Sequence, residues 1–154
     1  MSRPLFPLKK ILVSTDGSEN ADRAVRAAIE LAKQSEASLI ILSVVIESIP
    51  QSYSPIGINI PPDFSRYFEL AEQEGKKIVD TAVDGAKKES INVEGRVLTT
   101  MTSVVESVVE EASKKQIDLI VVGTRGLGGF RKLVLGSVSS GIVAHAKCAV
   151  LVVR

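Results

Sequence analysis

Hydrophobic and polar positions follow two alternating patterns along the chain. Four short runs are continuously apolar and rich in Ile, Leu and Val, which is typical of strands buried on both faces of a sheet. A fifth run is weaker because polar residues interrupt it. The five expected strands begin at Ile11 (ILVS), Leu39 (LIILSVV), Val93 (VEGRVLT), Ile117 (IDLIVVG) and Ala149 (AVLVV).

The segments between these runs carry apolar residues three or four positions apart, which predicts four helices. The inward residues are expected to be Ala21, Ala24, Val25, Ala28, Leu31 and Ala32 in the first helix, and Phe64, Phe68, Ala71, Ile78, Ala82 and Ala86 in the second. The third helix is expected over residues 103–114 with Val104, Val105, Val108 and Ala112 inward, and the fourth from Gly136 or Ser137 with Val138, Ile142 and Val143.

Strand and helix alternate from end to end, which favours a parallel sheet with helices on both faces. We therefore expect an α/β, Rossmann-like open sheet of five parallel strands, built as a single domain of residues 1–154. In such sheets the ligand crevice lies beyond the carboxyl ends of the strands, where the winding reverses. If the first strand pairs with the fourth at that point, the loops that follow them become neighbours.

One connection departs from this regular pattern. Residues 47–63 contain four prolines and show no periodicity. Loops of this length without regular structure are often lids, binding loops or disordered segments. We expect a mobile loop near the crevice, with a surface insertion that has no role as the alternative.

Composition limits the classes of protein to consider. The chain has 154 residues, 45% of them hydrophobic and 24% charged, which is the balance of a soluble globular protein. A formal charge of +1 gives no general electrostatic attraction to nucleic acid or to an anionic membrane. The apolar run at residues 38–46 is far shorter than the ~20 residues that span a bilayer, and the N-terminus does not resemble a signal peptide. We therefore expect a cytoplasmic protein.

Cys148 and His145 are the only residues of their types. A single cysteine excludes an internal disulfide and a cysteine cluster for metal, and its apolar surroundings predict a buried, inert thiol. His145 lies near the end of the fourth expected helix without a second histidine or cysteine beside it. We expect it to face solvent or to cap the helix.

Glycines are concentrated where the fourth expected strand ends. Gly123, Gly126, Gly136 and Ser137 have the spacing G-x2-G-x9-G-S. Glycine lets backbone amides approach a phosphate, and the start of a helix adds unpaired amide donors and a positive dipole end. The stretch therefore predicts a polyphosphate site, with simple turn formation and ordinary helix capping by Ser137 as the alternative. Further positive charge in the stretch comes from Arg125, Arg131 and Lys132.

Two familiar phosphate-binding motifs do not fit this stretch. A Walker loop requires lysine and then serine or threonine after GxxxxG, where this chain has Gly129 and Phe130. The dinucleotide fingerprint requires glycine at the position of Arg131, and it follows the first strand instead of the fourth.

The loop after the first expected strand contains Asp16 and Ser18. Asp-Gly is ordinary turn chemistry and Ser18 suits the start of a helix, so both residues have a structural explanation. Opposite a phosphate site, the Asp16 carboxylate could instead accept hydrogen bonds from the base or ribose of a nucleotide, or help to hold magnesium.

Taken together, ILVSTDGSENADRAV at the start, LIILSVV in the second strand and GTRGLGGFRKLVLGSVSSGIVAHAKCAVLVVR at the end resemble the universal stress protein family, in its ATP-binding subgroup. The resemblance covers essentially the whole chain. It implies the strand order 3-2-1-4-5 and a homodimer formed through the last strand, residues 149–153. One departure is Ala149, where the family often has proline, because it leaves an extra backbone N–H at the strand entrance.

The resemblance also implies which residues bind the nucleotide. Asp16 matches the aspartate that contacts the adenosine part, and Val44 matches the position whose backbone contacts adenine. The expected cofactor is ATP, which family members often bind together with magnesium or manganese, although no residue of this sequence fixes the metal. The remaining expected positions are Ser14, Thr15, Val122, Gly123, Arg125, Gly126, Gly136, Ser137 and Val138.

The sequence contains no visible machinery for efficient catalysis. It has no nucleophile elbow and no HExxH motif, and Asp16 is the only candidate for a base or a water-orienting group. We therefore expect an ATP-binding regulatory module of a stress response whose downstream partner the sequence does not name. The alternatives are a slow ATPase or ATP-using enzyme of a related adenine nucleotide-binding fold, and a nucleotide-free dimeric scaffold.

Overall fold

The computed structural model of the chain describes residues 7–47, 63–124 and 135–154. The described strands are all parallel, and their order in the sheet is β3-β2-β1-β4-β5. The predicted fold and strand order are therefore confirmed. The elements are β1 (Lys10–Ser14), α1 (Glu19–Ser35), β2 (Ser38–Ile46), α2 (Asp63–Lys88), β3 (Val93–Thr100), α3 (Val104–Lys114), β4 (Leu119–Gly123), α4 (Ser137–His145) and β5 (Ala149–Val153).

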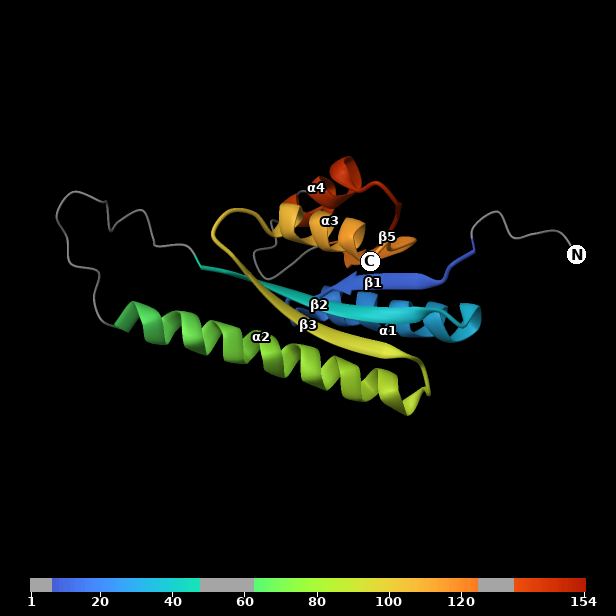
Figure 1. The fold of residues 1–154 in the computed structure, drawn as a ribbon, viewed down its shortest axis with the longest axis horizontal. Helices are drawn as coiled ribbons and strands as arrows, with labels where there is room; N and C mark the ends of the chain where they lie inside the picture. The colour runs from blue at the N-terminus through green and yellow to red at the C-terminus, as the bar shows by residue number, and fades with distance from the viewer. Residues whose placement is uncertain (1–6, 48–62, 125–134) are drawn as a thin grey trace, which may run out of the picture.

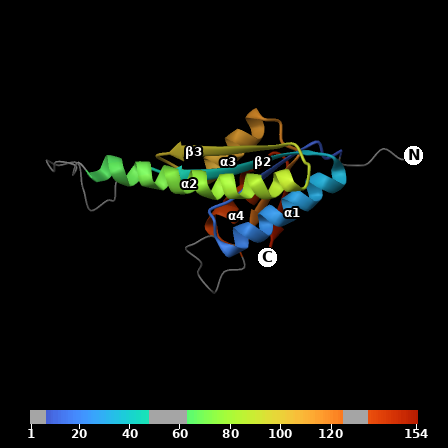
Figure 2. The same ribbon diagram turned by 90° about the horizontal axis from the view of Figure 1, so that it is seen from below.

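Helices cover both faces of the sheet, with α1 and α2 on one side and α3 and α4 on the other (Figure 1). Viewed from below, α1 and α2 both lie on the near side of the strands (Figure 2). Alternation along β1 distributes its side chains between the two layers: Ile11 and Val13 pack toward α1, and Leu12 packs toward α3 and α4. All three are fully buried. The continuous apolar runs therefore belong to strands that are covered on both faces.

Helices α1 and α3 begin where the sequence predicts. The Ser18 side chain caps α1 by accepting a hydrogen bond from the Ala21 amide, and Ser103 caps α3 by accepting one from the Glu106 amide. The predicted stripe of α1 is confirmed, since five of its six residues are buried and Leu31 is half-buried. In α3, Val108 and Ala112 are buried while the two valines nearer the start of the helix are half-buried.

The predicted inward faces of α2 and α4 need correction. In α2 the buried apolar residues are Val79 and Ala86, of which only Ala86 was expected, while the other described residues of the predicted stripe are half-buried. The side chain of Phe64 lies outside the described part. In α4, Ile142 is buried as expected, but Val138 and Val143 are 38% and 49% exposed. Since α4 has only nine residues and is apolar on several sides, spacing alone does not single out its inward face.

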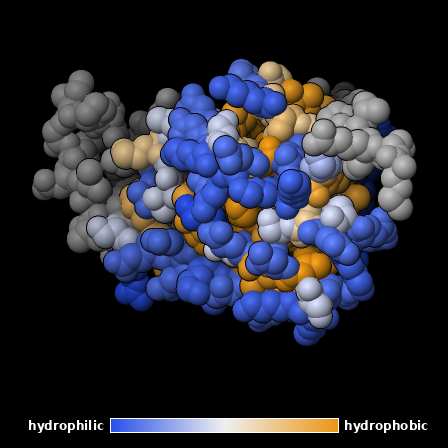
Figure 3. All heavy atoms as spheres, turned by 45° about the vertical axis from the view of Figure 1, so that its right-hand side comes forward, coloured by the Kyte–Doolittle hydropathy of each residue, from blue (hydrophilic) through white to orange (hydrophobic). Residues whose placement is uncertain are grey.

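The surface is mainly hydrophilic on the face drawn in Figure 3, where apolar residues show in separate patches. Among the described helices, none is long and apolar enough to cross a membrane. Of the connection predicted to be mobile, residues 47–63, all but the first and last residue lie outside the described part of the chain.

Candidate functional site

Strands β1 and β4 are neighbours at the point where the winding of the chain reverses. Val13 pairs with Val121, so Ser14 and Val122 occupy the next level of the sheet and the two strands end side by side. The predicted pairing of the first and fourth strands is confirmed. Val122 is only 3% exposed and packs against the α3 and α4 layer, which leaves its backbone for any contact with a ligand.

The loop after β1 is shaped by its own side chains. Thr15 is buried and its N–H donates to the Leu42 carbonyl, while its hydroxyl accepts from the Gly17 amide at 3.2 Å. The Asp16 carboxylate accepts from the Ser18 amide at 3.0 Å. Gly17 has a φ of 76°, a conformation that glycine adopts without steric cost. These bonds shape the loop and hold Asp16, which is half-buried, directly after the end of β1.

Gly123 ends β4 in close contact with the backbone of α1. A Cβ at this position would lie 2.8 Å from the carbonyl carbon and oxygen of Asn20. Glycine is thus required here by the approach of a helix, which explains its presence without a ligand. The same contact places the first turn of α1 beside the end of β4.

The start of α4 is attached to the residue that follows β4. The Gly136 amide donates to the Thr124 carbonyl at 2.6 Å, and the Ser139 hydroxyl donates to the same carbonyl at 3.0 Å. Thr124 and Ser139 are buried polar residues for which the sequence analysis predicted no role. Because spacing does not single out the inward face of this short helix, the sequence carried no signal that pointed to Ser139.

The first turn of α4 has an electrostatic environment unlike those of α1 and α3. Its N-cap is Gly136, which makes no side-chain cap, and the turn contains no acidic residue. By contrast, α1 and α3 start with a serine cap and carry acidic residues in the first turn. The positive end of the α4 dipole is therefore not balanced by its own first turn. Ser137 and Val138 are exposed there, and the alternative that Ser137 is an ordinary N-cap is wrong.

Val44 lies on β2, beyond the level at which the neighbouring strand β1 ends. Strand β1 ends where Ser14 pairs with Leu42, and β2 continues for four residues past that level to Ile46. Val44 pairs with Leu98 of β3, is half-buried and packs against the α3 and α4 layer. The extension of β2 therefore provides an apolar edge beside the end of β1.

Two predicted site residues, Arg125 and Gly126, lie outside the described residues, as do Arg131 and Lys132. Of the remaining predicted residues, the structure brings those at the ends of β1, β2 and β4 to one edge of the sheet, together with the start of α4. Among the described residues, no group of three or more His, Cys, Asp and Glu side chains could hold a metal ion.

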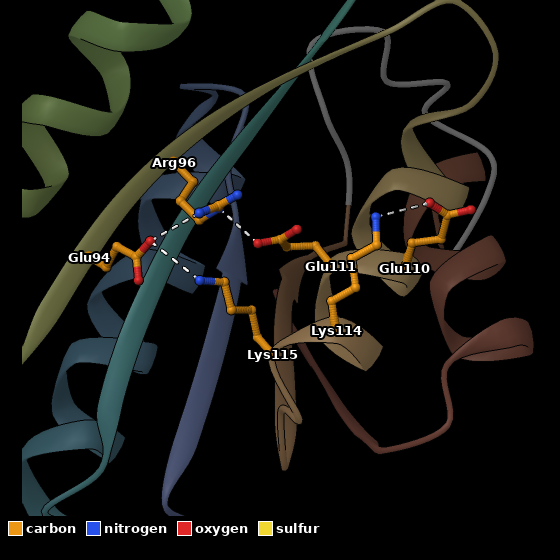
Figure 4. Close-up of polar contacts among 6 residues, drawn as sticks. All are labelled: Glu94, Arg96, Glu110, Glu111, Lys114 and Lys115. Carbon is orange, nitrogen blue, oxygen red and sulfur yellow. Dashed lines mark hydrogen bonds and ion pairs between the residues drawn. The ribbon is translucent and has the colours of Figure 1, made fainter.

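A second polar cluster joins β3 to α3 (Figure 4). The Arg96 Nε lies 2.7 Å from the Glu111 Oε1, Arg96 donates to Glu94 at 3.1 Å, and Lys115 lies 3.7 Å from Glu94. Glu111 is only 5% exposed. In the described part of the chain, the facing Arg96 and Glu111 atoms have no partner with hydrogen-bond geometry, so charge attraction joins them. The cluster lies near the amino end of β3, away from the crevice, and we assign it to stability.

Cys148 and His145 lie outside the crevice residues. Cys148 is half-buried, where a buried thiol was expected, and burial raises the pKa of the thiol above 9.0. The predicted exposure of His145 is confirmed, and its Nδ1 donates to the Gly141 carbonyl at 2.8 Å. This bond to the preceding turn gives His145 a structural role at the end of α4.

Comparison with known proteins gives consistent matches. A sequence profile described as the Universal stress protein family matches residues 7–154. The chain is 33% identical over 147 residues to the Universal stress protein YxiE of Bacillus subtilis, covering 94% of this chain and 98% of that protein.

Solved structures agree with the sequence matches. The universal stress protein UspA from Lactobacillus plantarum superposes with a TM-score of 0.81 at 24% identity, covering 95% of this chain and 97% of that one. A universal stress protein in complex with cAMP superposes with a TM-score of 0.69 at 30% identity, again covering 95% and 97% of the two chains. The fold is thus shared along nearly the full length of each protein.

Proposed function

The chain belongs to the universal stress protein family, and from that membership we propose that it is a single-domain, ATP-binding regulatory module of the stress response without efficient catalysis. The nucleotide lies across the carboxyl ends of β1 and β4. Asp16 and Val44 contact its adenosine part, and Gly123, Gly136, Ser137 and Val138 surround its ribose and phosphates. Arg125 and Gly126 are assigned to the phosphates from the sequence alone.

One observation carries the proposal: the Gly136 amide donates to the Thr124 carbonyl at 2.6 Å. This bond joins the two ends of the glycine-rich stretch and holds the start of α4 at the end of β4. An anion at the crevice would meet a helix start that has a glycine cap and no acidic residue in its first turn. The solved relative that contains cAMP supports an adenine nucleotide as the class of ligand.

The test is direct detection of nucleotide and measurement of its affinity. We expect mass spectrometry of freshly purified, denatured protein to detect ATP, ADP or AMP, and calorimetry to give saturable ATP binding by the stripped protein. Gly126→Val should weaken ATP binding by about tenfold or more, because a side chain would occupy phosphate space. Gly85→Val is the matched control, since a Cβ there meets nothing within 4 Å. Unchanged ATP affinity in Gly126→Val would contradict the assignment.

A slow ATPase is the alternative form of this function. Asp16 is the candidate for orienting water, although its carboxylate also accepts from the Ser18 amide and shapes the loop. Incubation with labelled ATP over hours separates the two cases. We expect bound ATP to persist, whereas steady turnover that Asp16→Asn abolishes would favour the enzyme.

We also propose a homodimer that pairs β5 with β5 of a second copy. Strand β5 forms one edge of the sheet, is apolar throughout, and exposes Leu151 by 37%. An apolar strand edge of this kind pairs readily with another chain. Sedimentation should show a dimer for the unchanged protein and a monomer for Leu151→Glu. Val143→Glu changes an exposed apolar residue of α4 and should remain a dimer; a dimeric Leu151→Glu variant would contradict the proposed interface.

A further inference from the structure

Ser139 is a polar residue in the buried face of α4. It is 3% exposed, and in this nine-residue helix the buried residues are Ser139 and Ile142. Its hydroxyl lies 3.0 Å from the Thr124 carbonyl and 3.2 Å from the Gly136 carbonyl. A hydroxyl has one proton to donate, and burial makes a missing bond costly. The Ser139 hydroxyl therefore bonds to the carbonyl groups of Thr124 and Gly136, near the two ends of the glycine-rich stretch.

Thr124 provides a fixed point for this bond. It is 6% exposed, and its N–H donates to the Val153 carbonyl of β5 at 2.9 Å. Its carbonyl accepts from both the Gly136 amide and the Ser139 hydroxyl. The N–H of Thr124 thus belongs to the sheet, while its carbonyl holds the first turn of α4.

Among the described residues, two hydrogen bonds to the Thr124 carbonyl tie the start of α4 to the end of β4. Val138 is exposed, and the closely packed residues of α4 lie after its first turn: Ile142 is buried, and Gly141 approaches Val105 of α3 so closely that a Cβ would lie 2.7 Å from it. The Gly136 amide provides one attachment, through its bond to the Thr124 carbonyl. The Ser139 hydroxyl adds a second point of attachment to the same carbonyl, and two attachments define the direction of the first-turn amides.

We propose that Ser139 is a positioning residue for the nucleotide phosphates. It does not touch the ligand; through the Thr124 carbonyl, it sets where the first-turn amides of α4 point. This inference rests on the proposed ATP site. Because the β1 loop and β2 hold most of the adenosine part and only its ribose reaches the start of α4, loss of the Ser139 hydroxyl should weaken ATP binding more than adenosine binding.

The experiment compares ATP with adenosine as ligands of the full-length protein. Calorimetry should show that Ser139→Ala binds ATP about five to ten times more weakly, the loss expected from one hydrogen bond. Its affinity for adenosine should fall by a clearly smaller factor. Ser139→Thr keeps the hydroxyl and should restore ATP affinity. Ser107→Ala is the matched control, because the Ser107 hydroxyl donates to the Ser103 carbonyl at 3.0 Å in α3.

Each outcome decides the proposal. Equal loss of ATP and adenosine affinity in Ser139→Ala would indicate a merely structural role and overturn it, as would unchanged ATP affinity. If the unchanged protein binds neither ligand, the proposed ATP site itself fails and this inference fails with it. Should Ser139→Ala not fold, Ser139→Cys, which keeps a weak donor of similar size, should show the same selective loss of ATP affinity.

Discussion

Replacement of Gly123 by alanine tests how closely α1 approaches the end of β4. An alanine Cβ would lie 2.8 Å from the carbonyl carbon and oxygen of Asn20 and 3.1 Å from the Ala21 nitrogen. Favourable contacts between carbon atoms are at about 3.5–4.0 Å, so one of the two elements must move by roughly 0.7 Å or more. All three atoms are backbone, and a change of rotamer cannot relieve the clash.

The expected loss of stability follows from two opposing effects. Forcing an extra methyl group into a packed contact costs about 1–3 kcal/mol. Alanine also reduces the conformational entropy of the unfolded chain, which by itself would raise the free energy of unfolding by about 0.4–1 kcal/mol. We therefore expect Gly123→Ala to lower the free energy of unfolding by about 1–2 kcal/mol. Movement of α1 would also displace Ser18 and the loop before it, so ATP affinity should fall as well.

Urea denaturation followed by circular dichroism measures the effect, with equal slopes for all variants as the sign of an unchanged unfolding transition. Gly85→Ala is the control, because Gly85 lies exposed in α2 and its Cβ would meet nothing within 4 Å. It should raise the free energy of unfolding by about 0.5–1 kcal/mol. A Gly123→Ala variant as stable as the unchanged protein, or stabilised like the control, would refute the close contact.

Three further predictions concern side chains outside the crevice. Burial holds the pKa of the Cys148 thiol above 9.0, so a thiol reagent at neutral pH should label it more slowly in the folded protein than in urea; equal rates would contradict this. The hydrogen bond between the exposed side chains of Lys33 and Glu89 lowers the pKa of Glu89 below 4.5 and raises that of Lys33 above 10.5. The unchanged protein should thus be slightly more stable than Lys33→Met at neutral pH, and this difference in stability should vanish as the pH falls below 4.5 or rises above 10.5. A difference in stability that survives at both extremes of pH would exclude the ion pair as its cause. Arg96→Leu leaves the buried Glu111 carboxylate without its partner and should lower the free energy of unfolding by about 2–3 kcal/mol. This is less than the usual cost of breaking a fully buried ion pair, because the Arg96 side chain is 31% exposed. A loss under about 0.5 kcal/mol in urea denaturation would show that the pair contributes no more than a surface salt bridge.

The sequence predicts the sheet well because its strands are buried on both faces. Runs such as residues 39–45 contain almost no polar residue, and helices separate them at regular intervals, which leaves few topologies. The helix starts at Ser18 and Ser103 are equally local, since a cap involves residues only three positions apart. These features require no knowledge of distant contacts.

The features that the sequence did not predict depend on contacts between residues that are far apart in the chain. The exposure of Val138 and Val143 follows from how a nine-residue helix sits on the sheet, which its own spacing does not determine. The close contact at Gly123 requires the position of the α1 backbone, about a hundred residues away in sequence. The role of Ser139 depends in the same way on the Thr124 carbonyl. A pattern can mark such residues as small or polar, but only the packed fold identifies their partners.

The bond between the Thr124 amide and the Val153 carbonyl has a practical consequence for preparing the protein. Val153 is the last residue of β5, so proteolysis within this strand removes the acceptor that Thr124 uses. Such a cut would thereby loosen the end of β4 and the start of α4, which lie far upstream in sequence. A protein preparation in which β5 has been clipped should not be used to judge whether nucleotide binds.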